Sequence, residues 1–266
     1  MKTNCLFLLL SVFFISCSSD SSGDDSSDLP ATLYYPSNTG NFWTYDIEGT
    51  PSGRDSLYIS NDTVINALIY KKFKTKNQPL GFYSNSLSKN GVRKSGDQLL
   101  VSGKLGLNFT DQFPLNITLS DFIAFKESAA PNEILGTTTG SFQQTVQGYP
   151  LTFDYSLTSK AIGTLASFTS PNTDVYPDVK SISVTLNLKI TTIYQAPGLP
   201  ISIPVTILPA QDVIISTQYY AKNIGVVHTN TDIHYQLASL PSQIQLPIPS
   251  SGSQNQQEFL DTYHIN

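Results

Sequence analysis

Cysteine is scarce in this chain, and its positions exclude several kinds of chemistry. Cys5 and Cys17 are the two cysteines in 266 residues. Cys5 lies in a leader that we expect to be removed, as argued below, so the body of the protein carries no thiol. A disulfide framework, a thiolate metal site and a cysteine nucleophile are therefore not expected in the body.

Charged residues are also sparse, at 13% of the chain. Of 15 basic and 20 acidic residues, Lys2 lies in the leader and four aspartates lie in residues 17–28. Residues 29–266 then carry 14 basic and 16 acidic side chains, a net charge of −2. Nucleic-acid binding needs a strongly basic face, so no nucleic-acid partner is expected.

Long apolar runs are absent except at the start of the chain. Residues 6–15 are apolar apart from Ser11, they follow Lys2, and the small Ser16 precedes Cys17. A membrane-spanning helix needs about 20 apolar residues, so this run is too short to be one. Its layout is that of a secretory signal peptide, which we assign to residues 1–16.

Cys17 gives the leader a more specific interpretation. Residues 14–17, Phe-Ile-Ser-Cys, resemble the lipobox of bacterial lipoproteins, although Phe14 stands where leucine is usual. The resemblance implies lipidation of Cys17 with diacylglycerol and a further acyl chain such as palmitate, and hence a membrane partner through the anchor. Several acyl chains hold a protein firmly, whereas one chain holds it marginally. A plain signal peptide with an incidental cysteine is the alternative.

Residues 17–28 have no apolar side chain after the cysteine and contain four aspartates. Such a segment cannot bury a core, so we expect a disordered tether. It is similar to the acidic signal that directs Bacteroidota lipoproteins to the outer face of the outer membrane. The predicted location is thus the outer membrane, with the cell surface favoured over the periplasmic face. A plain periplasmic linker is the alternative.

Alternating polar and apolar residues dominate residues 29–266, which we expect to form a single β-rich domain, with a split near Pro131 as the alternative. The longest alternation covers residues 181–194 and places Ile182, Leu186 and Ile190 on one side. A period of two indicates strands, and no apolar stripe of helical spacing is present. The predicted class is all-β, a large antiparallel, strongly curved sheet (half-barrel or sandwich) with little helix.

Particular strands and turns follow from the same pattern. Asn61-Asp62 is predicted to be a turn before a strand at residues 63–75, and Asn90-Gly91 to join strands at residues 81–87 and 92–101. Further hairpins are expected at residues 141–157 and 212–237. Lys72, Lys74 and Lys76 share one side of their strand, which favours a solvent face or a protected edge. An anion-binding patch is the alternative.

Two proline-rich, uncharged segments interrupt the pattern, at residues 196–210 and 240–249. Proline does not fit a central strand, so we expect loops or edges there. They are interpreted as apolar crossing loops packed on the sheet. The alternative is an exposed apolar rim that contacts a ligand, partner or membrane, through residues Leu199, Ile201, Ile203, Leu246 and Ile248.

Two motifs resemble a group of proteins. Residues 34–45 look like the opening of many uncharacterised Bacteroidota lipoproteins, with Gly40-Asn41-Phe42-Trp43-Thr44-Tyr45 starting the first strand. Residues 219–227 are similar to their closing Tyr-Ala-Lys-x-Ile-Gly hairpin. The resemblance implies a curved antiparallel sheet of the lipoprotein-carrier type, with glycines in turns and aromatics in the core, and it carries over no catalytic residue. Two short patterns also look like O-glycan acceptor sites of the same phylum, at Ser56 and Thr63.

Catalytic signatures are missing from the sequence. No nucleophile elbow, zinc-protease motif or phosphate loop is present. His228 and His234 are too far apart on one strand to share a metal, and we expect both to face solvent. No catalytic residue, metal or cofactor is therefore assigned.

Three hypotheses remain for the function. The first is a non-enzymatic protein that binds an apolar ligand in a large cavity. The second is an envelope or surface interaction module with an exposed aromatic patch of Tyr34, Tyr35, Tyr219 and Tyr220. The third is a surface hydrolase or glycan-binding module, for which sixteen acids could supply a carboxylate pair but no pattern selects one.

Overall fold

The computed structural model describes residues 34–108, 114–195, 202–241, 244, 246 and 248–266. Strand accounts for 72% of the residues and helix for 3%, which confirms the all-β class. In chain order the described elements are β1 (Phe42–Glu48), β2 (Gly53–Ile65), β3 (Leu68–Thr75), α1 (Phe82–Leu87), β4 (Gly91–Ser95), β5 (Gln98–Asn108), β6 (Pro114–Lys126), β7 (Ile134–Val146), β8 (Tyr149–Thr169), β9 (Val175–Gln195), β10 (Ser202–Ala221), β11 (Gly225–Gln236) and β12 (Ser251–His264).

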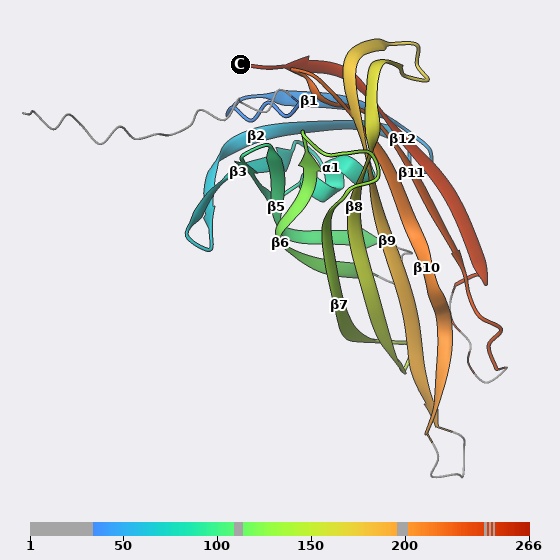
Figure 1. Cartoon of the computed structure of the whole chain (residues 1–266). Coiled ribbons are helices and arrows are strands. Elements are labelled where there is room, and N and C mark those ends of the chain that lie inside the picture. The colour runs from blue at the N-terminus through green and yellow to red at the C-terminus, as the bar shows by residue number, and fades with distance from the viewer. Residues whose placement is uncertain (1–33, 109–113, 196–201, 242–243, 245, 247) are drawn as a thin grey trace, which may run out of the picture.

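All twelve strands belong to one antiparallel sheet that is nearly closed on itself. The order is β6-β5-β4-β3-β2-β1-β12-β11-β10-β9-β8-β7, so the first and last strands pair at its middle. Figure 1 shows the long strands β8–β10 running down one side while β1–β3 curve across them. The predicted curved antiparallel sheet is confirmed, in its barrel-like rather than its sandwich form.

The two ends of the sheet, β6 and β7, are neighbours in sequence and approach each other in space. The Ser159 hydroxyl on β8 donates a hydrogen bond to the Ile123 carbonyl on β6. Lys126 at the end of β6 pairs with Glu133 just before β7, at 2.6 Å. Gly136 on β7 leaves room for this approach, since a Cβ there would lie 3.0 Å from the backbone of Ile123.

The two motifs that resemble Bacteroidota lipoproteins, residues 34–45 and 219–227, contact each other in the folded chain. The Trp43 indole N–H on β1 donates to the Ile224 carbonyl at 2.6 Å, and the Tyr45 hydroxyl donates to the Val226 carbonyl at 2.9 Å. Gly40 and Gly225 have φ values of +93° and +105°, which residues with a Cβ rarely adopt. The predicted roles of the glycines in turns and the aromatics in the core are confirmed.

Helix α1 overturns one prediction. Residues 82–87 form a helix rather than a strand, and Asn90-Gly91 does not form a hairpin turn because Gly91 begins β4. The helix lies on the concave side of the sheet (Figure 1) and buries Phe82, Tyr83 and Leu87. Six residues are too few for a stable isolated helix, so this conformation depends on contacts from distant strands, described below.

The β2–β3 turn is also displaced from its predicted position. Asn61 and Asp62 lie within β2, beyond an irregularity in the pairing at Ile59/Asn61. The turn falls at Asn66-Ala67, with φ values of 49° and 64°. Two consecutive positive φ values form the hairpin turn that matches strand twist, and the usual glycine is missing from it.

The first proline-rich segment is not a loop throughout. Residues 196–201 lie outside the described residues, but residues 202–210 belong to β10. Pairing of β10 with β11 begins only at Ile214, so Pro204 lies where β10 pairs with β9 alone, and Pro209 lies in an irregularity of that pairing between Leu208 and Gln211. Proline is tolerated at such an edge because its missing N–H faces no partner strand.

Candidate binding cleft beside helix α1

The start of helix α1 is held by side chains from strands β2 and β12. The backbone N–H of Gly81 donates to Asp55 Oδ2 at 2.8 Å, and that of Leu80 donates to the same carboxylate. The N–H of Phe82 donates to Gln256 Oε1 at 2.9 Å. The amide nitrogen of Gln256 donates in turn to the Leu80 carbonyl at 3.0 Å.

Glu258 completes this arrangement from β12. Its Oε1 accepts the Tyr83 N–H at 2.7 Å and the Thr229 hydroxyl at 3.0 Å. Its Oε2 accepts the N–H and the hydroxyl of Ser84 at 3.4 and 3.3 Å. The first N–H groups of a helix have no partner within it, and here distant side chains supply those partners.

The pKa of the buried Glu258 carboxyl is raised. Burial raises its pKa to about 7, against the opposing effect of the hydrogen bonds from Tyr83 and Thr229, and the neighbouring Asp55 carboxyl raises it further. Glu258 is 0% exposed and Asp55 is 3% exposed. Both carboxyls therefore serve the fold, as fixed acceptors for helix α1.

An open cleft of about 790 Å³ lies beside the start of α1. A typical small-molecule site has a volume of about 300–1,000 Å³. None of the described residues that line this cleft is charged. The lining comprises Thr50, Pro51, Gln78, Pro79, Leu80, Gly81, Phe82, Asn85, Gly106, Ile214, Ile233, Tyr235, Gly252, Ser253, Gln254 and Gln256.

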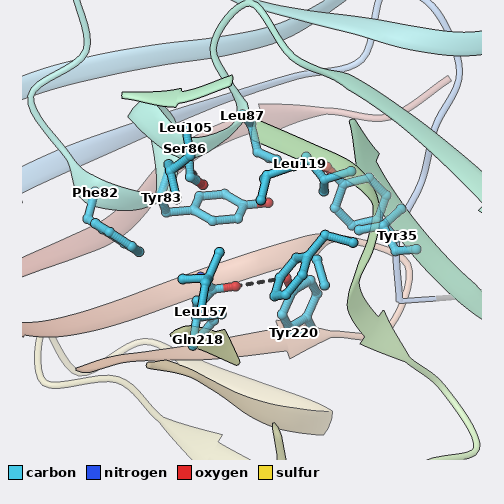
Figure 2. A pocket seen from close by; sticks show the side chains of 15 residues that line it. Tyr35, Phe82, Tyr83, Ser86, Leu87, Leu105, Leu119, Leu157, Gln218 and Tyr220 are labelled. Atoms are coloured by element: carbon cyan, nitrogen blue, oxygen red, sulfur yellow. Dashed lines mark hydrogen bonds between the residues drawn. The ribbon is translucent and has the colours of Figure 1, made fainter. Parts of the chain in front are cut away.

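A second space lies on the inner side of α1, and it is small. Figure 2 shows the rings of Tyr35, Tyr83 and Tyr220 around it, with Tyr220 donating to Gln218 Oε1 at 2.9 Å. Its volume is about 40 Å³. A water molecule needs at least about 10–15 Å³ measured this way, so the space has the scale of water and is far too small for an acyl chain.

The acids near the cleft are not placed to react with a ligand in it. Neither Asp55 nor Glu258 belongs to the residues that line the cleft. Their oxygens accept the hydrogen bonds of α1, and backbone covers them. A glycosidase needs two carboxyls that flank the scissile bond, so this buried pair does not form such a site.

The histidines do not form a site either. His228 is 3% exposed, so its predicted solvent-facing position is wrong, whereas His234 is exposed as predicted. The His228 ring stacks on Tyr219 and Phe259, and its Nδ1 lies 3.0 Å from the Glu258 carbonyl. Burial lowers the pKa of His228 to about 4. Within the described residues no group of acids, histidines or cysteines could hold a metal ion.

The structure separates the residues predicted to form an apolar rim. Leu199 and Ile201 lie outside the described residues. Ile203 on β10 is 46% exposed. Leu246 and Ile248 are partly buried against the core and line a hollow of about 550 Å³ within the segment that joins β11 to β12, which does not include Ile203.

The predicted exposed patch of four tyrosines is wrong for three of them. Tyr34, Tyr35 and Tyr220 are 8%, 2% and 1% exposed, so they do not form a surface patch. Tyr219 is partly buried and stacks on Phe168, with ring centroids 4.0 Å apart. These aromatics fill the core and one outer stack instead of contacting a partner.

Cys17 lies outside the described residues, and its lipidation stays a prediction. Ser56 is half-buried within β2, where its carbonyl accepts the N–H of Lys76. Thr63 lies close to the β2–β3 turn, and the preceding Asp62 pairs with Lys71 at 2.6 Å. Glycosylation at either position also stays a prediction.

The cleft residues were missed because each is inconspicuous in sequence. Gln78, Asn85 and Gln256 come from a loop, a helix and a strand, and no local spacing links them. Asp55 carries a weak signal, since it is an acid at an inward-facing strand position. Such a residue needs a buried partner, but the sequence does not show which.

No family model matches this chain, and no curated protein matches it. A candidate lipoprotein from Parabacteroides distasonis has a solved structure that matches with a TM-score of 0.39 and 11% sequence identity. The match covers 88% of this chain and 99% of that chain. Likeness at this level places the chain in no family. Among the described residues, no helix has the length and apolar character needed to span a membrane.

Proposed function

We propose that this chain is a lipid-anchored envelope protein that binds a neutral oligosaccharide in the cleft beside α1. The observation that carries the proposal is the lining of that cleft. Amide side chains of Gln78, Asn85 and Gln254 and the hydroxyl of Ser253 line it, without a charged residue among the described lining residues. Amides both donate and accept hydrogen bonds, as the hydroxyls of a sugar do. The amide nitrogens of Asn85 and Gln254 donate within the protein, to the Gly106 and Thr50 carbonyls, so these two residues would offer their oxygens as acceptors.

The apolar part of the lining suits the same ligand. Pro51, Phe82 and Tyr235 contribute apolar surface beside the amides. A sugar ring has an apolar C–H face as well as hydroxyls at its edge, so a mixed surface matches both. Charged ligands would find no counter-charge among the described lining residues.

An apolar ligand, the first hypothesis, is less well supported. The space on the inner side of α1 measures about 40 Å³, because α1 and the aromatic side chains fill the interior. A lipid carrier needs an enclosed apolar volume for acyl chains. The open cleft, in contrast, is lined by polar and apolar groups in similar proportion.

The anchor and the location rest on the sequence. Cys17 follows a signal peptide of residues 1–16, and the acidic residues 17–28 favour the outer face of the outer membrane. A glycan-binding protein held there would meet polysaccharide outside the cell. The intact mass of the mature chain tests this part, because an acylated Cys17 is expected as the first residue.

Calorimetric titration of the purified protein with cellohexaose, xylohexaose and mannohexaose tests the cleft, with hexagalacturonate as the charged counterpart. We expect at least one neutral hexasaccharide to bind, and Gln78→Ala/Gln254→Ala to weaken it about tenfold or more. Gln257→Ala is the matched control, since Gln257 lies outside the lining of the cleft.

Two results would overturn the proposal. One is that the charged hexasaccharide binds while the neutral ones do not, or that none binds. The other is that the double variant binds as tightly as the unmodified protein.

A further inference from the structure

The β2–β3 hairpin ends in an apolar tip, which we define as Val64, Leu68 and Ile69. Their exposed fractions are 69%, 44% and 66%. By comparison, the exposed Ile134 pairs with Lys160 and the exposed Val175 pairs with Thr169, so neither has an apolar partner across its strand pair. Isolated exposed apolar residues are normal, whereas a contiguous group marks an interaction site.

The tip is apolar on both faces of its ribbon. Val64 pairs with Ile69, and Ile65 pairs with Leu68. Successive residues of a strand point to opposite faces, so Ile69 and Leu68 project on opposite sides. A protein partner would cover one face of the ribbon, whereas lipid surrounds both.

Lysines follow the tip along β3. Residues 61–76 contain Asp62 and four lysines, Lys71, Lys72, Lys74 and Lys76, a net charge of +3 in a body of net charge −2. Among the described residues only Lys71 of these four has a carboxylate partner, Asp62. Burial lowers the pKa of Lys72, and the like charge of Lys74 lowers it further.

We propose that this hairpin tip inserts into the surface of a membrane that carries anionic headgroups. Ile69 and Lys71 are two residues apart, or roughly 7 Å along a strand. Peripheral elements bury their apolar parts about 5–10 Å into the headgroup and acyl boundary. Lys71 would therefore lie level with the phosphates when the tip is in the acyl region. Lys72 and Lys74, farther along β3, would face the anionic surface from outside it, and its negative charge would offset the repulsion between them.

The inference rests on the membrane anchoring in the proposed function but not on the cleft. The 17 residues that precede Tyr34, residues 17–33, can span up to roughly 60 Å when fully extended. A compact domain of this size is about 35–45 Å across, and the 21-residue strands β8 and β9 make this one longer along their direction. The tether is long enough to cross the shorter dimension, so the anchor permits the hairpin, which projects away from the body in Figure 1, to reach the same bilayer.

A fluorescent label on Val64→Cys in the full, lipidated protein tests the proposal. The protein is reconstituted in vesicles of phosphatidylglycerol and phosphatidylethanolamine that contain a nitroxide lipid quencher. We expect the label at position 64 to be quenched about twofold or more, and less in phosphatidylcholine vesicles. Val175→Cys, whose parent side chain is 63% exposed at another end of the molecule, is the matched control and stays unquenched.

The tip itself is tested by Leu68→Asp/Ile69→Asp in the Val64→Cys background. This change is expected to abolish the quenching while the protein stays folded and anchored. Ile193→Asp, at a similarly exposed strand position, is expected to leave the quenching unchanged.

The number of labels per chain distinguishes failure of the lipid anchor from failure of the hairpin proposal. An acylated Cys17 accepts no label, so one label per chain on a protein whose intact mass includes the acylated Cys17 confirms the anchor, and two or more labels refute it. One unquenched label refutes the hairpin proposal while the anchor stands. A dimer in detergent that is broken by the Leu68→Asp/Ile69→Asp change would also refute it, because the tip would then bind a second copy.

Discussion

The His228 ring lies against the backbone carbonyl of Glu258, and the pKa values of the two side chains are shifted in opposite directions. The pKa of Glu258 rises from 4.5 to about 7, mainly through burial. The pKa of His228 falls from 6.5 to about 4, also through burial. Between about pH 4 and 7 the folded state therefore favours the neutral form of both the His228 imidazole and the Glu258 carboxyl.

The two shifts have opposite consequences for stability. Glu258 binds its proton more tightly in the folded state, so its contribution to the free energy of unfolding falls as the pH rises from about 4.5 to about 7. His228 binds its proton more weakly when folded, so its contribution grows as the pH rises from about 4 to 6.5. Each effect is on the order of 3 kcal/mol, and the two largely cancel.

Single substitutions are expected to expose each effect. With Glu258→Gln, the free energy of unfolding should rise between about pH 4 and 6.5, because the His228 effect is left alone. With His228→Gln, it should fall between about pH 4.5 and 7. Urea unfolding monitored through Trp43, the single tryptophan, measures both slopes. Equal slopes in the two variants would contradict the assignment, and Glu48→Gln on the exposed side of β1 is the control.

Helix α1 shows how an element can depend on residues far from it. Its N–H groups are paired by Asp55, Gln256 and Glu258, and Gly81 lies directly against the Glu258 carboxylate. A Cβ at position 81 would overlap that carboxylate. Because the carboxylate holds Tyr83 and Ser84, displacing it would release the start of the helix.

Gly81→Ala is therefore expected to lower the free energy of unfolding by about 1–3 kcal/mol and to speed amide exchange at residues 82–87. Gly106→Ala is the matched control, since a Cβ there would meet its nearest atom, Asn116 Oδ1, at 3.8 Å. Both glycines line the cleft. If the two substitutions have equal effects on exchange, the helix does not depend on the Glu258 carboxylate.

The last strand joins the two halves of the sheet. β12 lies between β1 and β11, and its register joins Phe42 to His264. Pairings between such distant parts of the chain slow folding, because a large loop must close first. The sheet is consequently complete only when both ends of the body are present.

Removal of residues 251–266 is expected to abolish cooperative unfolding, since it exposes two central strand edges and the core between them. Removal of residues 265–266 is the control, because it deletes the side chain of Ile265 and the contacts of Asn266 with Asn38, Thr39, Asn41 and His264 but leaves β12 whole. Near-ultraviolet circular dichroism and thermal melting distinguish the two. A cooperative melt of the longer truncation would show that β12 is dispensable.

Much of the fold could be predicted from the sequence because strand alternation is local. The side chains of Ile182, Leu186 and Ile190 alternate with polar residues, and all three are buried in β9. The motifs around Trp43 and Gly225 indicated a turn and core aromatics, which the structure confirms. Local pattern also explains the error at Asn90-Gly91, where a good turn dipeptide lies between a helix and a strand.

The tertiary structure alone decided the rest. Residues 82–87 form a helix because Asp55, Gln256 and Glu258 satisfy its amide groups, and the last two lie about 175 positions away. The neutral cleft is assembled from a loop, a helix and several strands whose proximity follows from closure of the sheet. The burial of His228 likewise depends on Tyr219, Phe259 and Phe168 from three strands. The sequence by itself determined most of the strands and predicts the anchor signal, whereas packing between distant strands determined which polar residues became buried and which line the cleft.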